Sequence, residues 1–520
     1  MSTPTKSYNP ASRFKVVPPL LADAYKLGHP FLYDKGVTRV YSNSTARMSR
    51  IPGIEKVVAL GLQPAIQMYL HEQMRDFFFD LPKDEALAQF KHVTTAMFGP
   101  ERITVDHFSD LHDLGYVPME FRSIPEGTLV DLGVPHFTMD STRPNFGWIT
   151  NSWETLLSCS YWPMSTSATT ARLFRAQTLD ALRACGAPLS LVEFMNHDFS
   201  LRGMMGVLAG MLSGTGHLTQ GVGTDTVPAI PFIEHFYDID ATKHLVGTSV
   251  LATEHAIMTQ RGPFGEFSKY EDLLRENPFG VLAIVSDTYN LWKVICEYLP
   301  RLKELILARK SDPWSGAPGR LMIRPDSGDP IKIVCGDPDA TPGSPEYKGV
   351  IELLWEVFGG EERQVGKTTF EVLHPQIGCV YGDGITLDRQ RRIFEGLMAK
   401  GFSVECMVFG LGSFTYALTT RDVFGHAVKA TLAEIDGKLV SMQKDPVTDK
   451  GKHSANKKSH RGFLRVEYDP ITGSYSTKQD VTEDEMRRSL LVPTWRNGEF
   501  IQRWNWLDVV ERAQTGLKAV

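Results

Sequence analysis

The sequence predicts an α/β protein: an irregular TIM-like α/β barrel inserted in a second α/β (α+β) domain. We place the barrel at residues 187–415 and the second domain at 1–186 and 416–520, so that both chain ends build it. One observation is the length of 520 residues, which exceeds what a single small core requires. The other is a recurring pattern in the middle of the chain, where a short apolar run ends in a polar cluster and a helix-like stretch follows.

The apolar runs of this middle part lack polar–apolar alternation, which is typical of strands covered on both faces in a parallel sheet. Ligand sites in such sheets lie at the carboxyl ends of the strands. Turn propensity is the better explanation of any single junction, but five junctions that carry Asp, Arg and Gly favour a shared site. The runs are Leu189 to Phe194, Val281 to Val285, Leu321 to Ile323, Ile377 to Val380 and Val404 to Val408. The clusters that follow them are Asn196-His197-Asp198, Ser286-Asp287, Arg324 to Asp329, Gly382-Asp383-Gly384 and Gly410 to Ser413.

Outside the middle part the pattern changes. A helical stretch at Lys83 to Met97 and a strand at Met119 to Ile124 are expected near the N-terminus. Near the C-terminus, Leu464 to Tyr468 alternates like a strand, and Lys444 to Arg461 is basic and rich in turn residues. We therefore expect the second domain to mix helices and strands.

Composition restricts the function classes. The net charge of -6 argues against a dedicated nucleic-acid-binding protein, although it leaves a local basic site open. The six cysteines show no CxxC spacing, which favours reduced thiols. Met1 to Phe14 has no apolar signal segment, and no apolar run approaches the roughly 20 residues that span a bilayer. We expect a cytoplasmic protein with neither a membrane nor a nucleic-acid partner.

Two glycine motifs are not interpreted as nucleotide sites. Gly366-Lys367-Thr368 resembles the end of a phosphate loop, but Glu361 stands where that motif needs its first glycine. We interpret this segment as a solvated turn. Gly221-Val222-Gly223 lacks the third glycine of a dinucleotide fingerprint.

The segment Arg324 to Pro330 places an arginine and two acids in a turn directly after an apolar run. Arginine offers a planar donor fork to phosphate, and a nearby carboxylate suits sugar hydroxyls or Mg2+. A structural salt bridge explains this segment equally well when it is taken alone. Gly382-Asp383-Gly384 adds a carboxylate between glycines that let the backbone approach a ligand closely. Gly410 to Ser413, followed by Arg421 and Lys429, indicates backbone donors and cations around a phosphate.

Together with further motifs in the same order, this segment closely resembles the nicotinate/nicotinamide phosphoribosyltransferase family, and within it the enzymes that use nicotinamide. The likeness extends from about residue 20 to residue 510, with too many separate motifs in one order for chance agreement. The motifs are Leu21 to Lys26, Pro125-Glu126-Gly127, His197 to Gly203, Gly223 to Val227, Ala252 to His255, Val285-Ser286-Asp287, Arg324 to Pro330 and Lys444 to Val447.

The resemblance implies a homodimer, with active sites at the subunit interface, that joins nicotinamide to 5-phosphoribosyl 1-pyrophosphate in NAD salvage. Nicotinamide mononucleotide and pyrophosphate would be the products, Mg2+ the cofactor and ATP a co-substrate hydrolysed through phosphorylated His255. Carried over by position, Phe199 and Tyr25 of the partner subunit would stack on the pyridine ring, and Asp225 would bind the carboxamide. Arg202, His255 and Arg324 would face the pyrophosphate, and Asp326, Gly382 and Asp383 would hold the ribose. Gly412, Ser413, Arg421 and Lys429 would surround phosphate groups, Arg47 would add charge from the neighbouring subunit, and Ser286 would also contact substrate. His255, Asp326 and Arg324 are the expected catalytic residues.

The reaction gives these residue types a physical reason. Displacement of pyrophosphate passes through an oxocarbenium-like state, in which Arg and Mg2+ stabilise the leaving polyanion. Asp326 and Asp383 would stabilise the developing cation. The pyridine nitrogen is the nucleophile, so no general base is needed. Because the ring becomes cationic, stacking strengthens by roughly 0.5–2 kcal/mol. Asp225 can accept a hydrogen bond from an amide but repels a carboxylate, so it would select nicotinamide over nicotinate.

Two alternatives stay open. The nearest is a nicotinate phosphoribosyltransferase, which Asp225 disfavours. The other is a non-catalytic nucleotide-binding protein that retains the fold, since Phe199, Tyr25 and His255 each have ordinary structural explanations when taken singly. The chain also departs from the family pattern at Leu411 to Phe414, which has fewer glycines, at Asn290, where aspartate is common, and at Ser200-Leu201. The first departure leaves open whether ATP coupling is retained.

Overall fold

The computed structural model describes residues 15–447 and 458–517, which divide into two compact units. The first unit combines the described residues up to Thr166 with Ile233–Ile239 and Thr420–Ala513. The second combines Ser167–Phe232, Asp240–Thr419 and the described residues from Gln514 onward. Each unit has its own buried apolar core. The α/β class expected from the sequence is confirmed.

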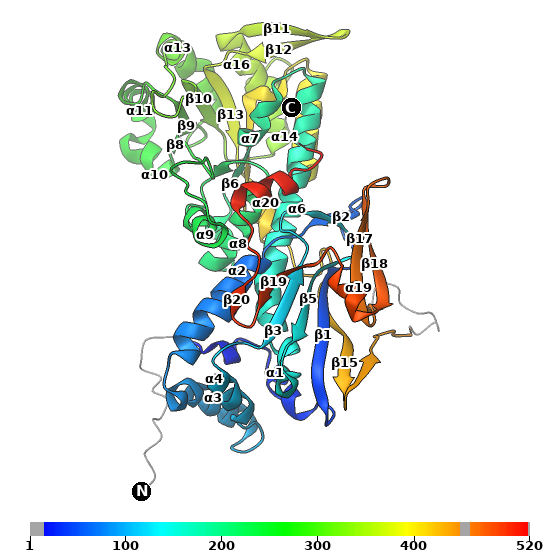
Figure 1. Cartoon of the computed structure of the whole chain (residues 1–520). Helices are drawn as coiled ribbons and strands as arrows, with labels where there is room; N and C mark the ends of the chain where they lie inside the picture. The colour runs from blue at the N-terminus through cyan, green and yellow to red at the C-terminus, as the bar shows by residue number, and fades with distance from the viewer. Residues whose placement is uncertain (1–14, 448–457, 518–520) are drawn as a thin grey trace. The chain divides into compact units, whose positions relative to one another are not determined.

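The second unit is built on a seven-stranded sheet whose neighbouring strands run parallel (Figure 1). A further parallel bridge joins Gly223 to Thr248, close to the opposite edge strand, so the sheet curls as a barrel does. Its core joins strand side chains to the buried faces of the flanking helices. In spatial order the strands are β7 (Gly223–Thr224), β6 (Asn196–Asp198), β14 (Met407–Leu411), β13 (Ile377–Tyr381), β10 (Arg320–Arg324), β9 (Val281–Val285) and β8 (Leu251–Ala252).

Three of the five expected strand runs are confirmed as β9, β10 and β13. The expectation for Leu189 to Phe194 is wrong, because a 3-10 turn (Leu189–Leu191) and helix α7 (Val192–Met195) precede the strand. Val192 and Met195, three residues apart, are the buried side chains, which is a helical spacing. The run Val404 to Val408 begins with a 3-10 turn, and β14 starts only at Met407.

The first unit contains an antiparallel seven-stranded sheet (Figure 1). The expected helix at Lys83 to Met97 is confirmed as α3 (Lys83–Phe98), and the alternating strand at Leu464 to Tyr468 as β17 (Phe463–Asp469). The predicted strand at Met119 to Ile124 is also confirmed. The sheet order is β16 (Lys438–Ser441), β15 (His426–Ile435), β1 (Val37–Ala46), β5 (Pro135–Ser141), β3 (Met119–Ser123), β19 (Val492–Arg496) and β20 (Glu499–Phe500).

The remaining elements connect and cover these sheets. In the first unit they are α1 (Ala24–Leu27), α2 (Leu62–Ala65), α4 (Asp106–Leu114), α5 (Ile149–Ser152), α19 (Glu483–Arg487), α20 (Trp506–Ala513), β2 (Lys56–Val58), β4 (Leu129–Asp131) and β18 (Ser474–Val481). In the second unit they are α8 (Val207–Leu218), α10 (His255–Met258), α11 (Gly262–Glu276), α12 (Leu291–Lys293), α13 (Leu299–Leu307), α14 (Pro330–Cys335), α15 (Pro345–Lys348), α16 (Val350–Phe358), α17 (Leu387–Ala399), α18 (Ser413–Tyr416), β11 (Gly360–Val365) and β12 (Thr368–Leu373). Helices α6 (Glu154–Ala184) and α9 (Ala229–Tyr237) contribute residues to both units.

Two sequence motifs have purely structural explanations. Gly366 forms the turn of the β11–β12 hairpin, which confirms the solvated turn. In Pro125-Glu126-Gly127, the buried Glu126 carboxylate accepts hydrogen bonds from the Tyr237 hydroxyl at 2.6 Å and the Gln63 backbone N–H at 2.7 Å. Gly127 has a φ of +88° and lies against the Val509 backbone, where a side chain would collide. The expected basic stretch at Lys444 to Arg461 lies partly outside the described residues.

Candidate functional site

The carboxyl ends of the parallel strands in the second unit carry most of the predicted site residues. Parallel strands end at the same edge of a sheet, so residues that follow them gather there. Phe199 follows β6, Asp225 follows β7, His255 comes shortly after β8, and Ser286 follows β9. Arg324 and Asp326 lie at the end of β10, Gly382 and Asp383 after β13, and Gly412 and Ser413 after β14.

The Phe199 ring lies directly on two glycines. A side-chain carbon at Gly382 would lie 3.1 Å from two atoms of the ring and 3.5 Å from an Asp326 carboxylate oxygen. A side-chain carbon at Gly410 would overlap the ring itself and would lie 2.7 Å from the Gly382 Cα atom. The structure therefore brings Phe199, Gly382 and Asp326 together, and the absence of side chains at both glycines gives the ring its position.

The ends of β9, β10 and β13 are tied to one another. The Asp326 backbone N–H donates to Asp287 Oδ2 at 3.0 Å, and the Ser286 N–H donates to the Arg324 carbonyl at 2.9 Å. The Tyr381 hydroxyl hydrogen-bonds the carbonyls of Ser327 and Gly328. These bonds fix the turn that carries Asp326 by its backbone and leave its carboxylate without a hydrogen bond from any described residue.

Arg324 does not form the structural salt bridge that its sequence context allowed. Its guanidinium forms no ion pair with a carboxylate among the described residues, and its buried Nε atom has no hydrogen-bond partner there. The buried Oδ1 atom of Asp287 has none either. Both atoms are therefore free to form a hydrogen bond with a ligand or a water molecule. Asp287 is a candidate that sequence reasoning quoted in a motif but gave no role.

The second acid of the Arg324 to Pro330 segment has a different task. The Asp329 side chain accepts hydrogen bonds from the N–H groups of Ile331 and Lys332 and so caps helix α14. Gly328 has a φ of +93°, which favours glycine in this turn. In this segment Gly328 and Asp329 therefore have structural roles, whereas Arg324 and Asp326 keep polar groups that are free to bind a ligand.

Asp225 is held by two donors on a single oxygen. Its Oδ1 atom lies 2.9 Å from His197 Nε2 and accepts the Ser249 hydroxyl at 2.5 Å. Burial works against the charged form, but the hydrogen bonds from His197 and Ser249, with the charge of Arg324, lower the pKa of Asp225 below its ordinary value. Sequence reasoning missed Ser249 and gave His197 no role.

His255 and Ser286 differ in their accessibility. His255 begins helix α10 on the surface, and its Nδ1 atom lies 3.0 Å from the Thr288 hydroxyl. The buried Ser286 hydroxyl donates to the Ile284 carbonyl at 2.7 Å and accepts from Tyr270 at 3.0 Å. The Ser286 side chain is therefore fully used within the protein, and its contact with substrate stays a prediction.

The turn after β6 approaches the loop after β14. Arg202 is exposed in a 3-10 turn (Leu201–Gly203), and Gly203 lies against the Ser413 side chain, leaving no room for a side chain of its own. Gly412 stands before the short helix α18, and a side-chain carbon there would make only an ordinary contact, 3.9 Å from the Gly382 carbonyl oxygen. Phe414, the residue that replaces a glycine of the family pattern, is 53% exposed. It therefore does not fill the interior of the loop.

Tyr25, Arg47, Arg421 and Lys429 belong to the first unit, and two of them line one cavity there. Arg47 and Lys429 share a cavity of about 270 Å³ with Lys458 and His460 among its other residues. Burial lowers the pKa of Lys429, and the charges of Arg47 and Arg421 add to this effect. Mutual repulsion of this kind is relieved by a bound anion. Tyr25 does not line this cavity, and its ring is 62% exposed.

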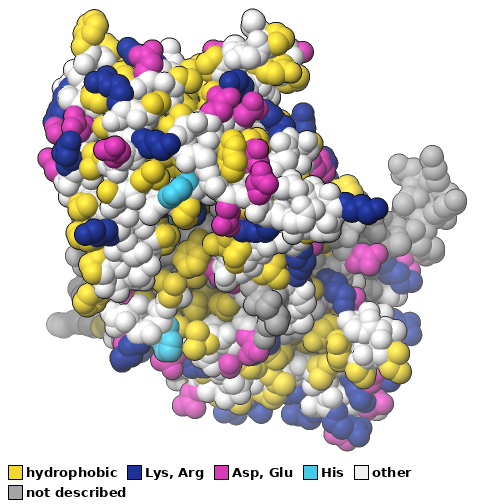
Figure 2. All heavy atoms as spheres, turned by 90° about the horizontal axis from the view of Figure 1, so that it is seen from above, with side chains coloured by type: hydrophobic (Ala, Val, Ile, Leu, Met, Phe, Trp, Pro, Cys, Tyr) yellow, Lys and Arg dark blue, Asp and Glu magenta, His cyan; other side chains and the backbone are white. Residues whose placement is uncertain are grey.

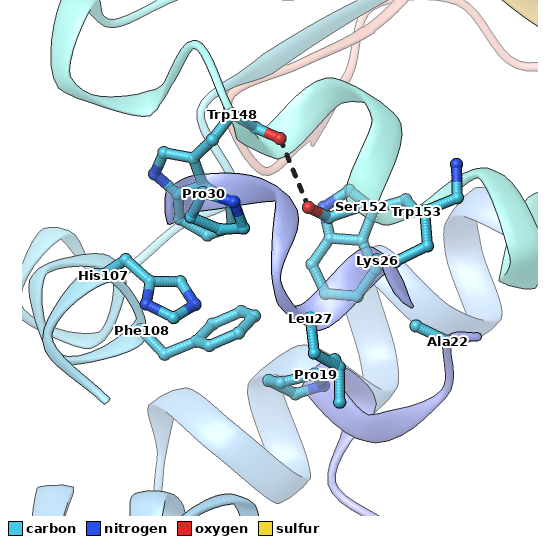
Figure 3. Close-up of a pocket in the computed structure, with 10 residues that line it drawn as sticks. All are labelled: Pro19, Ala22, Lys26, Leu27, Pro30, His107, Phe108, Trp148, Ser152 and Trp153. Carbon is cyan, nitrogen blue, oxygen red and sulfur yellow. Dashed lines mark hydrogen bonds between the residues drawn. The ribbon is translucent and has the colours of Figure 1, made fainter. Parts of the chain in front are cut away.

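A second pocket of the first unit, shown in Figure 3, has little room for a ligand. Its volume is about 10 Å³, which is near the space of one water molecule. The His107 ring lies there against Phe108 and Trp148, and neither of its buried nitrogens has a hydrogen-bond partner in the part of the chain that the structure describes. Burial lowers its pKa to about 4. This pocket is part of the core and carries none of the predicted substrate residues.

The charged surface does not by itself locate the site. On the face drawn in Figure 2, Lys and Arg side chains are interspersed with Asp and Glu side chains. Among the described residues, no group of three His, Cys, Asp or Glu side chains is placed to hold a metal ion, and no helix is long and apolar enough to cross a membrane.

The chain is similar to known proteins over most of its length. Residues 194–494 match the nicotinate phosphoribosyltransferase (NAPRTase) family. The nicotinamide phosphoribosyltransferase of Acinetobacter baylyi is 42% identical over 460 residues, which are 87% of this chain and 89% of that protein. The one of Xanthomonas campestris pv. campestris is 31% identical over 397 residues, 75% of this chain and 77% of that protein.

A solved structure has the same fold at much lower identity. The nicotinate-nucleotide pyrophosphorylase of Pyrococcus furiosus superposes with a TM-score of 0.57 at 14% identity, over 97% of this chain and 98% of that one. The resemblance drawn from the sequence motifs is thereby confirmed: this chain belongs to the nicotinate phosphoribosyltransferase (NAPRTase) family.

Proposed function

We propose that this protein is a nicotinamide phosphoribosyltransferase, which converts nicotinamide and 5-phosphoribosyl 1-pyrophosphate to nicotinamide mononucleotide and pyrophosphate. Family membership and the relatives named for this reaction support the reaction class. The observation that carries the choice of base is the Asp225 carboxylate, which is half exposed and has one oxygen free of described hydrogen bonds. A free carboxylate oxygen accepts a carboxamide N–H and repels the carboxylate of nicotinate.

The pyridine ring would stack on Phe199 with its amide toward Asp225. On the other face, Tyr25 of the partner subunit would complete the stack in a homodimer. Its high exposure in the single chain is compatible with that place. The ring gains positive charge as the new C–N bond forms, so an aromatic face would bind the transition state better than the substrate, by roughly 0.5–2 kcal/mol.

The phosphoribosyl group would lie over the ends of β10 and β13. Asp326 and Asp383 would accept hydrogen bonds from the ribose hydroxyls, close to the Gly382 backbone. Arg324, Arg202 and His255 would stabilise the departing pyrophosphate, and the unpartnered Nε of Arg324 supports this role. Gly412 and Ser413 would donate to phosphate oxygens. Arg421 and Lys429 would supply further cations, and Arg47 would add charge from the neighbouring subunit.

Mg2+ fits the acidic side of this site. The Asp326 backbone N–H donates to Asp287 Oδ2 at 3.0 Å, so these two acidic residues are adjacent, and after burial the charges of Asp383, Asp287 and Asp326 raise the pKa of Tyr381. We assign Asp287, with its unpartnered Oδ1, and Asp326 as protein oxygens for the ion. When bound, Mg2+ would neutralise charge on the pyrophosphate.

ATP would act as co-substrate by phosphorylating His255. The ring is exposed and its Nδ1 is engaged by Thr288, which leaves Nε2 as the atom available to a phosphoryl group. A cytoplasmic location is also proposed; all six cysteines are free thiols in the described chain, as suits a reducing compartment.

The test is product formation by the purified full-length protein with nicotinamide, phosphoribosyl pyrophosphate and Mg2+. Chromatography should detect nicotinamide mononucleotide and pyrophosphate in equal amounts, with more product when ATP is present. His255→Ala should abolish ATP hydrolysis and retain some transfer, whereas His244→Ala, a surface histidine elsewhere in the same unit, should behave as wild type. Absence of the mononucleotide would refute the proposal, and persistent ATP hydrolysis in His255→Ala would remove His255 from its role.

A further inference from the structure

The Asp225 carboxylate has an asymmetric environment. Both donors, His197 Nε2 at 2.9 Å and the Ser249 hydroxyl at 2.5 Å, lie on Oδ1. No described residue hydrogen-bonds Oδ2. The side chain is 50% exposed, so Oδ2 is open to a ligand while Oδ1 is occupied. An ionised carboxylate accepts hydrogen bonds and cannot donate, so His197 must carry its proton on Nε2 and Ser249 must direct its hydroxyl hydrogen to Oδ1.

His197 is well placed to hold this geometry. It is buried in the middle of β6, and its Nδ1 atom faces Gly223, where a side-chain carbon would lie 2.9 Å from that nitrogen. Its ring also lies 4.8 Å from the Phe199 ring, centre to centre. His197 therefore contacts both Phe199, the ring proposed to stack on the base, and Asp225, the proposed acceptor of its amide.

The backbone around the pair is fixed as well. The Asp225 N–H donates to the Asp198 carbonyl at 2.8 Å, and the buried Asp198 carboxylate accepts the Thr226 hydroxyl at 2.7 Å and the Ser200 N–H at 2.9 Å. The two turns that carry Phe199 and Asp225 thus share one buried anchor. With the backbone fixed in this way, the Asp225 side chain can still rotate. The two hydrogen bonds to its Oδ1 atom, from His197 and Ser249, restrict that rotation.

We infer that His197 and Ser249 are positioning residues that set base selectivity by orienting Asp225 with Oδ2 free and unprotonated. This rests on the proposed function. An acceptor-only oxygen at a fixed place binds an amide N–H and disfavours a carboxylate ligand. If the two donors were lost, the Asp225 carboxyl could rotate or take up a proton, and a protonated carboxyl can donate to nicotinate. Hydrogen bonds to the charged form also lower the pKa of Asp225, as the structure indicates.

The test compares kcat and KM for nicotinamide and nicotinate in wild type, Ser249→Ala, His197→Ala and His197→Gln, at several pH values. Ser249 is exposed, so its alanine variant should fold. Each lost donor should raise KM for nicotinamide about 3- to 10-fold, the effect of one hydrogen bond, and lower the nicotinamide preference by a similar factor. KM for phosphoribosyl pyrophosphate should not change.

His197→Gln places an amide N–H near the original Nε2 and should recover part of the selectivity lost in His197→Ala. Ser268→Ala, a surface serine on α11, is the matched control and should keep wild-type constants. Selectivity that stays at the wild-type value in both Ser249→Ala and His197→Ala would overturn the inference, as would a parallel rise in KM for phosphoribosyl pyrophosphate. A wild-type protein that makes no nicotinamide mononucleotide would instead refute the proposed function, and the inference with it.

Discussion

The position of the Phe199 ring can be tested by adding a single methyl group beneath it. In Gly410→Ala the new carbon would overlap the ring and lie 2.7 Å from the Gly382 Cα atom. In Gly382→Ala it would lie 3.1 Å from two ring atoms, and in Gly412→Ala it would lie 3.9 Å from its nearest neighbour. Forced overlaps of the first kind cost about 1–3 kcal/mol, so the ring must move.

The expected loss follows from the strength of the stack. An aromatic pair contributes about 0.5–1.5 kcal/mol beyond its buried area, so a ring displaced from the base should raise KM for nicotinamide about 2- to 12-fold in Gly410→Ala. Gly382→Ala should give a smaller rise, because its contact needs a shift of only a few tenths of an ångström, and Gly412→Ala should give the smallest. The cation–π contact between Phe199 and the charged ring of the transition state would weaken as well, so kcat should fall most in Gly410→Ala and least in Gly412→Ala.

Steady-state kinetics with saturating phosphoribosyl pyrophosphate measure the series, and thermal melting reports folding. Combining Gly382→Ala with Phe199→Ala provides the control, since without the ring the added methyl has nothing to displace and its effect on nicotinamide KM should vanish. Equal KM values across the three glycine variants, or an undiminished effect of Gly382→Ala in the absence of the ring, would refute the assignment of Phe199 as the platform for the base.

Three further predictions concern the first unit. His107→Phe should raise the free energy of unfolding by about 2 kcal/mol at pH 5 and flatten its pH dependence. The pKa of His107 is about 4 in the folded protein and about 6.5 in the unfolded chain, so the wild type loses stability as pH falls from 6.5 toward 4. Thermal melting from pH 4 to 8 checks this, and an unchanged acid slope would contradict it. Glu126→Gln should destabilise by about 1–3 kcal/mol, because a buried acceptor of the Tyr237 hydroxyl is weakened and an amide donor is added without a partner; a urea midpoint equal to that of wild type would contradict this. Lys429→Ala should raise KM for phosphoribosyl pyrophosphate without changing KM for nicotinamide, with the effect shrinking at high salt; equal effects on both substrates would place Lys429 outside the phosphate site.

The parallel strands were predictable where an apolar run is unbroken and rich in β-branched residues. Val281 to Val285 offers only a continuous β-branched and aliphatic run, and it became β9 with the same bounds. Leu189 to Phe194 failed because Val192 and Met195 also satisfy a helical period, and a short apolar run cannot exclude that alternative. The strand begins at Asn196 because that residue pairs with Phe409 of β14.

The site was predictable to the extent that its residues directly follow strands. Arg324 and Asp326 could be found in this way, but the separate task of Asp329 as a helix cap appears only once α14 is located. Ser249 lies in a short segment without a motif, and nothing in the sequence indicates that its hydroxyl reaches Asp225. Contacts between residues distant in sequence, such as Gly410 beneath Phe199, depend on the arrangement of the strands and require the structure.

Base selection tests the account most directly. Nicotinamide and nicotinate, supplied together at equal concentration with phosphoribosyl pyrophosphate and Mg2+, compete for the same enzyme, and the two mononucleotides can be separated and counted. The account predicts that wild type makes predominantly nicotinamide mononucleotide and that Asp225→Ser loses much of this preference. Predominant formation of nicotinate mononucleotide by wild type, or an unchanged product ratio in Asp225→Ser, would contradict it.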